Sequence, residues 1–163
     1  MEEYWDIYNE NRIFQHRTIR RGDTFGNGEY YICCEVWFQN SKGEMLITQR
    51  HQNKKAGGLW EFLGGGVLAG ETTAQAAMRE VKEEIGITIA ANELFLLYIH
   101  KDRNYFMDIY VAKKDIDIQS IALNENETIN AKWVSKKELQ TMIDNQEVVR
   151  SVARRFDMLK DKI

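Results

Sequence analysis

One stretch of the chain, residues 65–87, constrains the fold and the chemistry more than the composition does. Gly65 is followed after five residues by Glu71, and after seven more by Arg79-Glu80-Val81-Lys82-Glu83-Glu84-Ile85-Gly86-Ile87. Each residue type occurs at a frequency of roughly 5–10%, so the probability that these seven residues occur by chance at this spacing is well below one in a million. The stretch therefore belongs to one defined structural unit.

The second half of this stretch predicts a helix over about residues 73–85. Thr72 can cap its start, with Gln75 as the capping-box partner three residues later. Gly86 provides the left-handed position at which helices commonly end. An apolar stripe that can pack against a sheet is formed by Ala74, Ala77 or Met78, Val81 and Ile85.

Three glutamates occupy another face of this helix. Glu80, Glu83 and Glu84 stand at i, i+3 and i+4, where like charges repel by roughly a few tenths of a kcal/mol per pair. A hard divalent cation turns this repulsion into binding, because carboxylate oxygens suit Mg²⁺ or Mn²⁺. Three glutamates alone would indicate a solvated helix face, but the surrounding glycines, Glu71 and Arg79 favour a metal site.

The pattern resembles the Nudix box, the signature of the Nudix hydrolases, at every position from 65 to 87. The resemblance implies an α/β fold, an α/β/α sandwich with a mixed central sheet. It also implies Mg²⁺- or Mn²⁺-dependent hydrolysis of a diphosphate linkage in a nucleoside diphosphate joined to a group X. In the family the loop carbonyl at the position of Gly64 often joins the metal shell, and the box arginine, here Arg79, orients a carboxylate such as Glu71 or Glu83.

Residues just before the helix are predicted to meet the substrate. Gly64-Gly65-Gly66 lets the backbone approach an ion or a phosphate without an intervening side chain, so Gly65 and Gly66 are candidate substrate contacts. Arg50 ends a strand before this loop and can meet a phosphate, or form a surface salt bridge. Trp60 can stack on a base, or fill the core.

The expected chemistry needs a carboxylate that accepts a proton from water. Metal ions neutralise phosphate charge and acidify water, and phosphoryl transfer depends mainly on such positioning. Glu83, Glu84 and Glu127 all remain candidates for the base. Glu127 lies in a loop before a strand, where Nudix hydrolases often place another glutamate; Glu125 is the second choice, and a solvated loop glutamate is the alternative.

Two other functions remain open. A Nudix fold can serve as a non-catalytic module that senses a nucleotide or sugar nucleotide, although such modules often carry a degraded box. Isopentenyl-diphosphate isomerase shares the fold, but it needs a cysteine just before the box and several metal-binding histidines. Residues 60–66 contain no cysteine, which disfavours the isomerase.

Composition sets further bounds. The 163 residues suit one domain, and the net charge of −3 argues against bulk nucleic-acid binding. No apolar run approaches 18 residues, and the acidic N-terminus lacks a signal-peptide pattern, so we expect no membrane contact and a cytoplasmic protein. Cys33 and Cys34 are expected to be reduced. The expected partner is a small-molecule diphosphate, and the N-terminal extension can also serve a homodimer.

The remaining elements follow from hydrophobic patterning. Residues 1–28 are predicted to be an N-terminal extension of the same domain, with a small hairpin over 4–15 and a basic, glycine-rich loop over 16–28. Residues 29–163 would form the Nudix domain. Strands are predicted at 30–38, 44–50, 94–100, 105–112 and 129–134, and helices at about 136–143 and 146–160.

Overall fold

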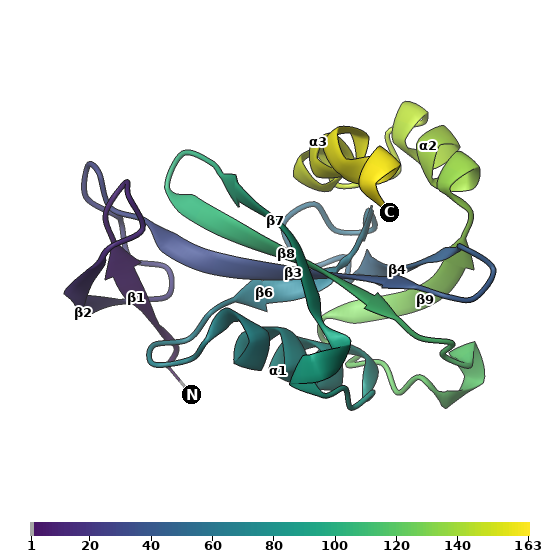
Figure 1. The fold of residues 1–163 in the computed structure, drawn as a ribbon, viewed down its shortest axis with the longest axis horizontal. Coiled ribbons are helices and arrows are strands. Elements are labelled where there is room, and N and C mark those ends of the chain that lie inside the picture. The colour runs from purple at the N-terminus through teal and green to yellow at the C-terminus, as the bar shows by residue number, and fades with distance from the viewer. Residues whose placement is uncertain (1) are drawn as a thin grey trace.

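A computed structural model describes residues 2–163 as a mixed sheet with helices on both faces. Helix α1 lies on one face, and α2 and α3 lie together on the other (Figure 1). The elements are β1 (Tyr4–Tyr8), β2 (Phe14–Arg20), β3 (Tyr31–Gln39), β4 (Met45–Arg50), β5 (Trp60–Glu61), β6 (Leu63–Gly66), α1 (Thr73–Ile85), β7 (Phe95–Lys101), β8 (Tyr105–Lys113), β9 (Thr128–Val134), α2 (Lys136–Asp144) and α3 (Arg150–Leu159), with short 3₁₀ turns at Ala91–Glu93, Ile118–Ser120 and Lys160–Lys162. The predicted α/β/α sandwich is confirmed.

The central strand of the sheet is β3. It runs parallel to β8 along its whole length, and β6 pairs with it antiparallel. The sheet order is β5-β4-β3-β8-β7, and β9 pairs with β4. This arrangement brings the glycine run of β6 against the middle of the sheet, beside Glu80 and Glu84 in the second half of α1.

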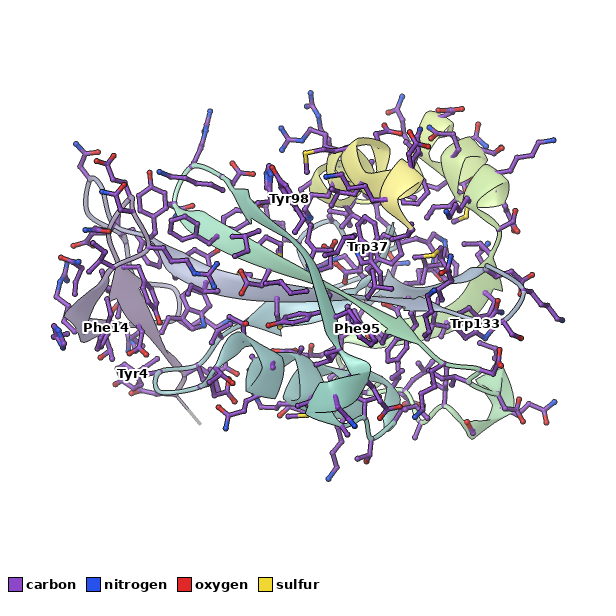
Figure 2. The ribbon with its side chains drawn as sticks, in the orientation of Figure 1. Tyr4, Phe14, Trp37, Phe95, Tyr98 and Trp133 are labelled. Carbon is purple, nitrogen blue, oxygen red and sulfur yellow. The ribbon has the colours of Figure 1, made fainter. Side chains whose placement is uncertain are left out.

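Side chains of β3 alternate between two hydrophobic clusters, as a pleated strand requires. Val36 and Phe38 pack in the cluster under α1, together with Val81 and Ile85. Trp37 points to the opposite face, toward α3 (Figure 2). Its ring stacks on Phe62 at a centroid distance of 4.6 Å. The sheet therefore buries apolar side chains on both faces, which holds all three helices.

Helix α1 has the predicted bounds, and its ends use the predicted residues. The Gln75 backbone N–H donates to the Thr72 hydroxyl at 3.2 Å, and the Thr72 N–H donates to the Gln75 side-chain oxygen at 2.8 Å. Gly86 ends the helix with a φ of 72°. The box glutamates are thus fixed along a helix whose start and end are both capped.

Two predicted boundaries were wrong. Residues 16–20, predicted as loop, belong to β2, because backbone pairing with β1 forms this strand although most of its side chains are exposed. The last helix begins at Arg150 rather than near residue 146. Val148 instead forms a bridge with Trp60, and the Trp60 N–H donates to the Glu147 carbonyl at 2.9 Å.

The hairpin of β1 and β2 is docked on the sheet by several contacts. Tyr8 and Tyr30 exchange two backbone hydrogen bonds of 2.8 Å. The Arg12 guanidinium donates to both carboxylate oxygens of Asp108, at 2.6 and 2.7 Å, and Asp108 is only 2% exposed. Trp5 stacks on Tyr31 at 4.5 Å. Among residues 2–163, no helix is long and apolar enough to span a membrane.

The Arg12–Asp108 pair makes the hairpin docking testable. Replacing Arg12 by alanine leaves a buried carboxylate without its cation, which we expect to cost about 2 kcal/mol of the free energy of unfolding. Urea unfolding followed by tryptophan fluorescence measures the change. Arg20→Ala removes exposed ion pairs of the same hairpin and should leave the midpoint nearly unchanged. Equal stability of Arg12→Ala and wild type would contradict the docking.

Candidate active site

The glycine run of β6 is packed so tightly that side chains are excluded. At Gly64, whose φ is +152°, a Cβ atom would overlap the backbone carbonyl oxygen of Cys34. At Gly65 it would overlap the carboxylate of Glu80, and at Gly66 the indole nitrogen of Trp5. The run therefore presents bare backbone between the box helix and the N-terminal hairpin.

Arg79 organises the acidic side chains around this run. Its guanidinium donates to Glu71 at 2.8 and 3.0 Å, to Glu80 at 2.7 Å, to Glu83 at 3.1 Å and to the Gly66 carbonyl at 3.0 Å. Burial opposes the charge of Arg79, but hydrogen bonds to Glu71 and Glu80 raise its pKa above the ordinary arginine value. Glu71 also accepts a hydrogen bond from the Leu68 N–H at 3.0 Å. The expected orienting contacts are present.

Glu84 is the most deeply buried of the box glutamates, with 5% of its surface exposed. One of its oxygens accepts a hydrogen bond of 3.1 Å from the Gly64 N–H. Burial, reinforced by the negative charges of Glu61 and Glu80, raises the pKa of Glu84 well above its ordinary value. Burial also raises the pKa of Glu80, although Arg79 opposes this. Burial is therefore the main reason that these two carboxyl groups ionise less readily than exposed glutamates.

Glu61, which was not among the predicted site residues, joins this group. Its carboxylate is largely buried, which raises its pKa, and both its oxygens accept hydrogen bonds from the Arg50 guanidinium at 2.7 and 2.6 Å. The sequence did indicate this position, because side chains alternate along a strand and Glu61, between Trp60 and Phe62, must point away from the side that these two residues bury. Arg50 also donates to the Lys55 carbonyl at 2.8 Å, so the structure shows the salt-bridge alternative for Arg50.

The other predicted residues lie in different surroundings. Glu83 is half-exposed on the helix, and Glu127 is half-exposed in the loop before β9, with Lys54 Nζ 3.2 Å from its carboxylate. The charge of Glu127 makes a minor contribution to the raised pKa of Glu80, which is due mainly to burial. Trp60 instead packs in the core below α3, with the Lys132 ammonium 4.8 Å above its ring, so it is not a cleft residue.

The donor set fits a hard divalent cation. The buried Glu84 and the partly buried Glu80 supply carboxylate oxygens beside a bare glycine backbone, and this is the ligand chemistry that Mg²⁺ and Mn²⁺ prefer. Within residues 2–163, no three acidic, histidine or cysteine side chains already converge at metal-binding distance. Arg79 draws Glu80 and Glu83 toward itself, so ion binding has to compete with these ion pairs.

A cleft of about 430 Å³ opens on the other side of the glycine run. Its walls come from the hairpin, the glycine run and α3, and three arginines line it. The lining residues are Trp5, Arg21, Tyr31, Cys33, Cys34, Glu35, Arg50, Lys55, Ala56, Glu61, Phe62, Gly64, Gly65, Gly66, Tyr105, Met107, Val149, Ser151, Val152 and Arg155. A ligand in this cleft would touch the glycine backbone directly.

The two cysteines beside the cleft are not reactive thiolates. Burial raises the pKa of the Cys33 thiol to about 12 and raises that of Cys34 as well. The Cys34 thiol donates to the Gly65 carbonyl, with a sulfur–oxygen distance of 3.7 Å. Both thiols therefore stay protonated near neutral pH, in line with the argument against an isomerase.

Comparison with known proteins agrees with the site. The family model of the NUDIX domain matches residues 34–156. An uncharacterised Nudix hydrolase of Listeria monocytogenes is 34% identical over 151 residues, covering 91% of this chain and 89% of the relative. The crystal structure of DR0079 from Deinococcus radiodurans has a TM-score of 0.77 at 23% identity, covering 94% of this chain and 98% of that one.

A further structural neighbour carries ligands. It is a bifunctional NMN adenylyltransferase/ADP ribose pyrophosphatase of Francisella tularensis, complexed with AMP and a manganese ion. Its TM-score is 0.61 at 18% identity, covering 82% of this chain and 42% of that one. The fold and the box together define a pyrophosphohydrolase of the Nudix type. The chain belongs to the Nudix family.

Two alanine substitutions in the glycine run test its packing. Gly65→Ala places a methyl group against the movable end of Glu80, so we expect the fold to survive while hydrolytic activity falls by about a hundredfold or more. Gly64→Ala places the methyl group against the fixed Cys34 carbonyl at a positive φ, so we expect loss of stability as well. Thermal unfolding and activity assays separate the two. Full activity in Gly65→Ala would contradict the packing.

Proposed function

We propose that this protein is a Mg²⁺- or Mn²⁺-dependent hydrolase of a diphosphate linkage, in a nucleoside diphosphate linked to X or a related organic diphosphate. The observation that carries this proposal is the pair of the buried Glu84 and the partly buried Glu80 against the bare glycine backbone at the edge of the cleft. Support comes from the Francisella tularensis neighbour, which was solved with AMP and manganese.

The residues of the Nudix box would have two different roles, metal binding and orientation. Glu80, Glu83, Glu84 and the Gly64 carbonyl would hold the ion. A bound ion of this kind neutralises phosphate charge and lowers the pKa of water. Arg79 and Glu71 hold the carboxylates in position through the fork of hydrogen bonds at Arg79. Their role is orientation, which is what phosphoryl chemistry needs most.

Glu84 and Glu127 are the two carboxylates best placed to accept the proton of the attacking water. The Gly64 N–H fixes the orientation of Glu84. Glu127 lies in the loop before β9, where it pairs with Lys54. Its side chain is half-exposed, so it can change its conformation. As the proton acceptor, Glu84 would have a fixed position, whereas Glu127 would be able to move with the substrate.

The cleft supplies the substrate contacts. The backbone at Gly65 and Gly66 lines it without side chains, so phosphate oxygens can approach closely. Lys55 lines the same cleft and adds positive charge. The aromatic rings of Trp5, Tyr31 and Tyr105 also line the cleft, and group X would lie against them.

The first test is Mg²⁺-dependent phosphate or nucleoside-monophosphate release across a panel of diphosphates, comparing wild type with Glu84→Gln. We expect hydrolysis of one substrate class to fall about a thousandfold in Glu84→Gln, because the variant loses both a metal ligand and a fixed carboxylate. Glu138→Gln, on the exposed start of α2, is the matched control and should retain wild-type rates.

Each outcome of this panel has a distinct meaning. Turnover that collapses in Glu84→Gln establishes the hydrolase and names X. Tight binding of a nucleotide without turnover in wild type would favour the sensing module instead. Turnover that is unaffected by Glu84→Gln would contradict the proposed role of the box helix.

Glu127 and Glu125 provide a second matched pair in one loop. Glu127→Gln should lower kcat about ten- to a hundredfold with little change in KM, because it removes a carboxylate that acts in the chemical step. Glu125→Gln should behave as wild type. Steady-state kinetics with the substrate identified by the panel makes the comparison. A larger loss in Glu125→Gln than in Glu127→Gln would reverse the assignment.

A further inference from the structure

Three arginines line the cleft, and two of them are committed to buried carboxylates. Arg155 is 4% exposed and pairs with Glu35, which is 3% exposed. Arg50 donates to both oxygens of the largely buried Glu61. Withdrawing either arginine would leave a buried carboxylate without its cation, which is strongly unfavourable. These two guanidinium groups are therefore held by the protein itself.

The third arginine, Arg21, has an exchangeable partner. Its guanidinium donates to Glu3 at 2.6 Å, and the two side chains are 62% and 39% exposed. Ion pairs between exposed side chains contribute little to stability. A phosphate group can therefore replace Glu3 at small cost, and a guanidinium binds two phosphate oxygens in the same forked geometry.

The backbone around Arg21 is anchored close to the glycine run. Its N–H donates to the Glu3 carbonyl at 2.8 Å, just beyond the end of β2. Strand β1 is in turn joined to the box loop, where the Ala69 N–H donates to the Tyr4 carbonyl at 2.8 Å. The hairpin therefore cannot drift away from the site, while the Arg21 side chain stays free to turn.

Arg21 and the three glycines line the same cleft of about 430 Å³. The hydrogen bond to Glu3 is the main reason that the pKa of Arg21 is raised, so the guanidinium carries its charge near neutral pH. A diphosphate in contact with the glycine backbone would therefore share the cleft with this charge.

We propose that Arg21 is a substrate-binding residue whose guanidinium leaves Glu3 and binds a phosphate of the bound diphosphate. This inference rests on the proposed diphosphate hydrolase function and assigns part of its binding site to the N-terminal hairpin. The hairpin lies outside residues 34–156, the part matched by the family model. Substrate binding in this chain therefore depends on a segment that precedes the shared domain.

Binding of methylenediphosphonate tests the proposal without turnover, because a carbon atom replaces the cleavable bridging oxygen. Isothermal titration calorimetry in Mg²⁺ compares wild type with four variants. Arg21→Gln should weaken binding about tenfold, and Arg21→Lys should recover part of this loss because it restores the charge. Glu3→Gln should tighten binding about two- to fivefold because the competing carboxylate is gone. Arg20→Gln, one residue away and outside the cleft lining, should bind within about twofold of wild type.

Kinetics with a hydrolysed substrate adds a second measurement. Arg21→Gln should raise KM with a smaller effect on kcat, since Arg21 binds the substrate in the ground state as well as in the transition state. Thermal unfolding of Arg21→Gln and Glu3→Gln provides the structural control. Both variants lose the same ion pair, so a merely structural role would change their affinities in the same direction.

The outcomes separate this inference from the proposed function. Arg21-dependent binding in a protein that hydrolyses no diphosphate would overturn the hydrolase and leave the assignment of Arg21 intact. Hydrolysis with equal methylenediphosphonate affinity in wild type and Arg21→Gln would overturn the assignment alone. Absence of methylenediphosphonate binding by wild type, or weaker binding in Glu3→Gln, would also overturn it.

Discussion

One guanidinium group joins most of the acidic side chains at the centre of this protein. Arg79 joins the loop at Glu71, the glycine run at the Gly66 carbonyl and the helix at Glu80 and Glu83. Carboxylates gathered at this density would otherwise repel one another and take up protons. Arginine suits the position because its planar fork serves several acceptors and its charge is permanent. Glu84 lies outside this fork and is held by the Gly64 N–H instead.

The glycine run is the second constraint on the site, because only residues without a side chain fit between its neighbours. Each of its three residues faces a different neighbour: a strand carbonyl, the Glu80 carboxylate and the Trp5 indole. The same narrow strip of backbone therefore lies between the Glu80 carboxylate and the lining of the cleft. Because β6 is hydrogen-bonded to β3 along this run, the central sheet fixes the strip and the site does not depend on loop order alone.

Local patterns in the sequence predicted the parts of the fold that local interactions determine. The capped helix over Thr73–Ile85 and the layered α/β architecture follow from spacing, caps and periodicity. The continuation of β2 over residues 16–20 was missed because its pairing partner, rather than its own side chains, makes it a strand. Partners distant in sequence decided the side-chain roles as well. Arg50 pairs with Glu61, and Trp60 packs in the core beneath α3. A short segment of sequence does not show which of its possible contacts each residue makes.

The docking of the hairpin has a consequence for the order of folding. Arg12 and its partner Asp108 are 96 residues apart in the chain, and Tyr31, on which Trp5 stacks, pairs with Tyr105 across the parallel strands. Contacts with such large sequence separation form slowly, because a long loop must close first. The hairpin must wait until β3 and β8 have paired before it has a surface to bind. A folding intermediate with a complete sheet but an undocked hairpin would carry the box helix intact, yet one wall of its cleft would be missing.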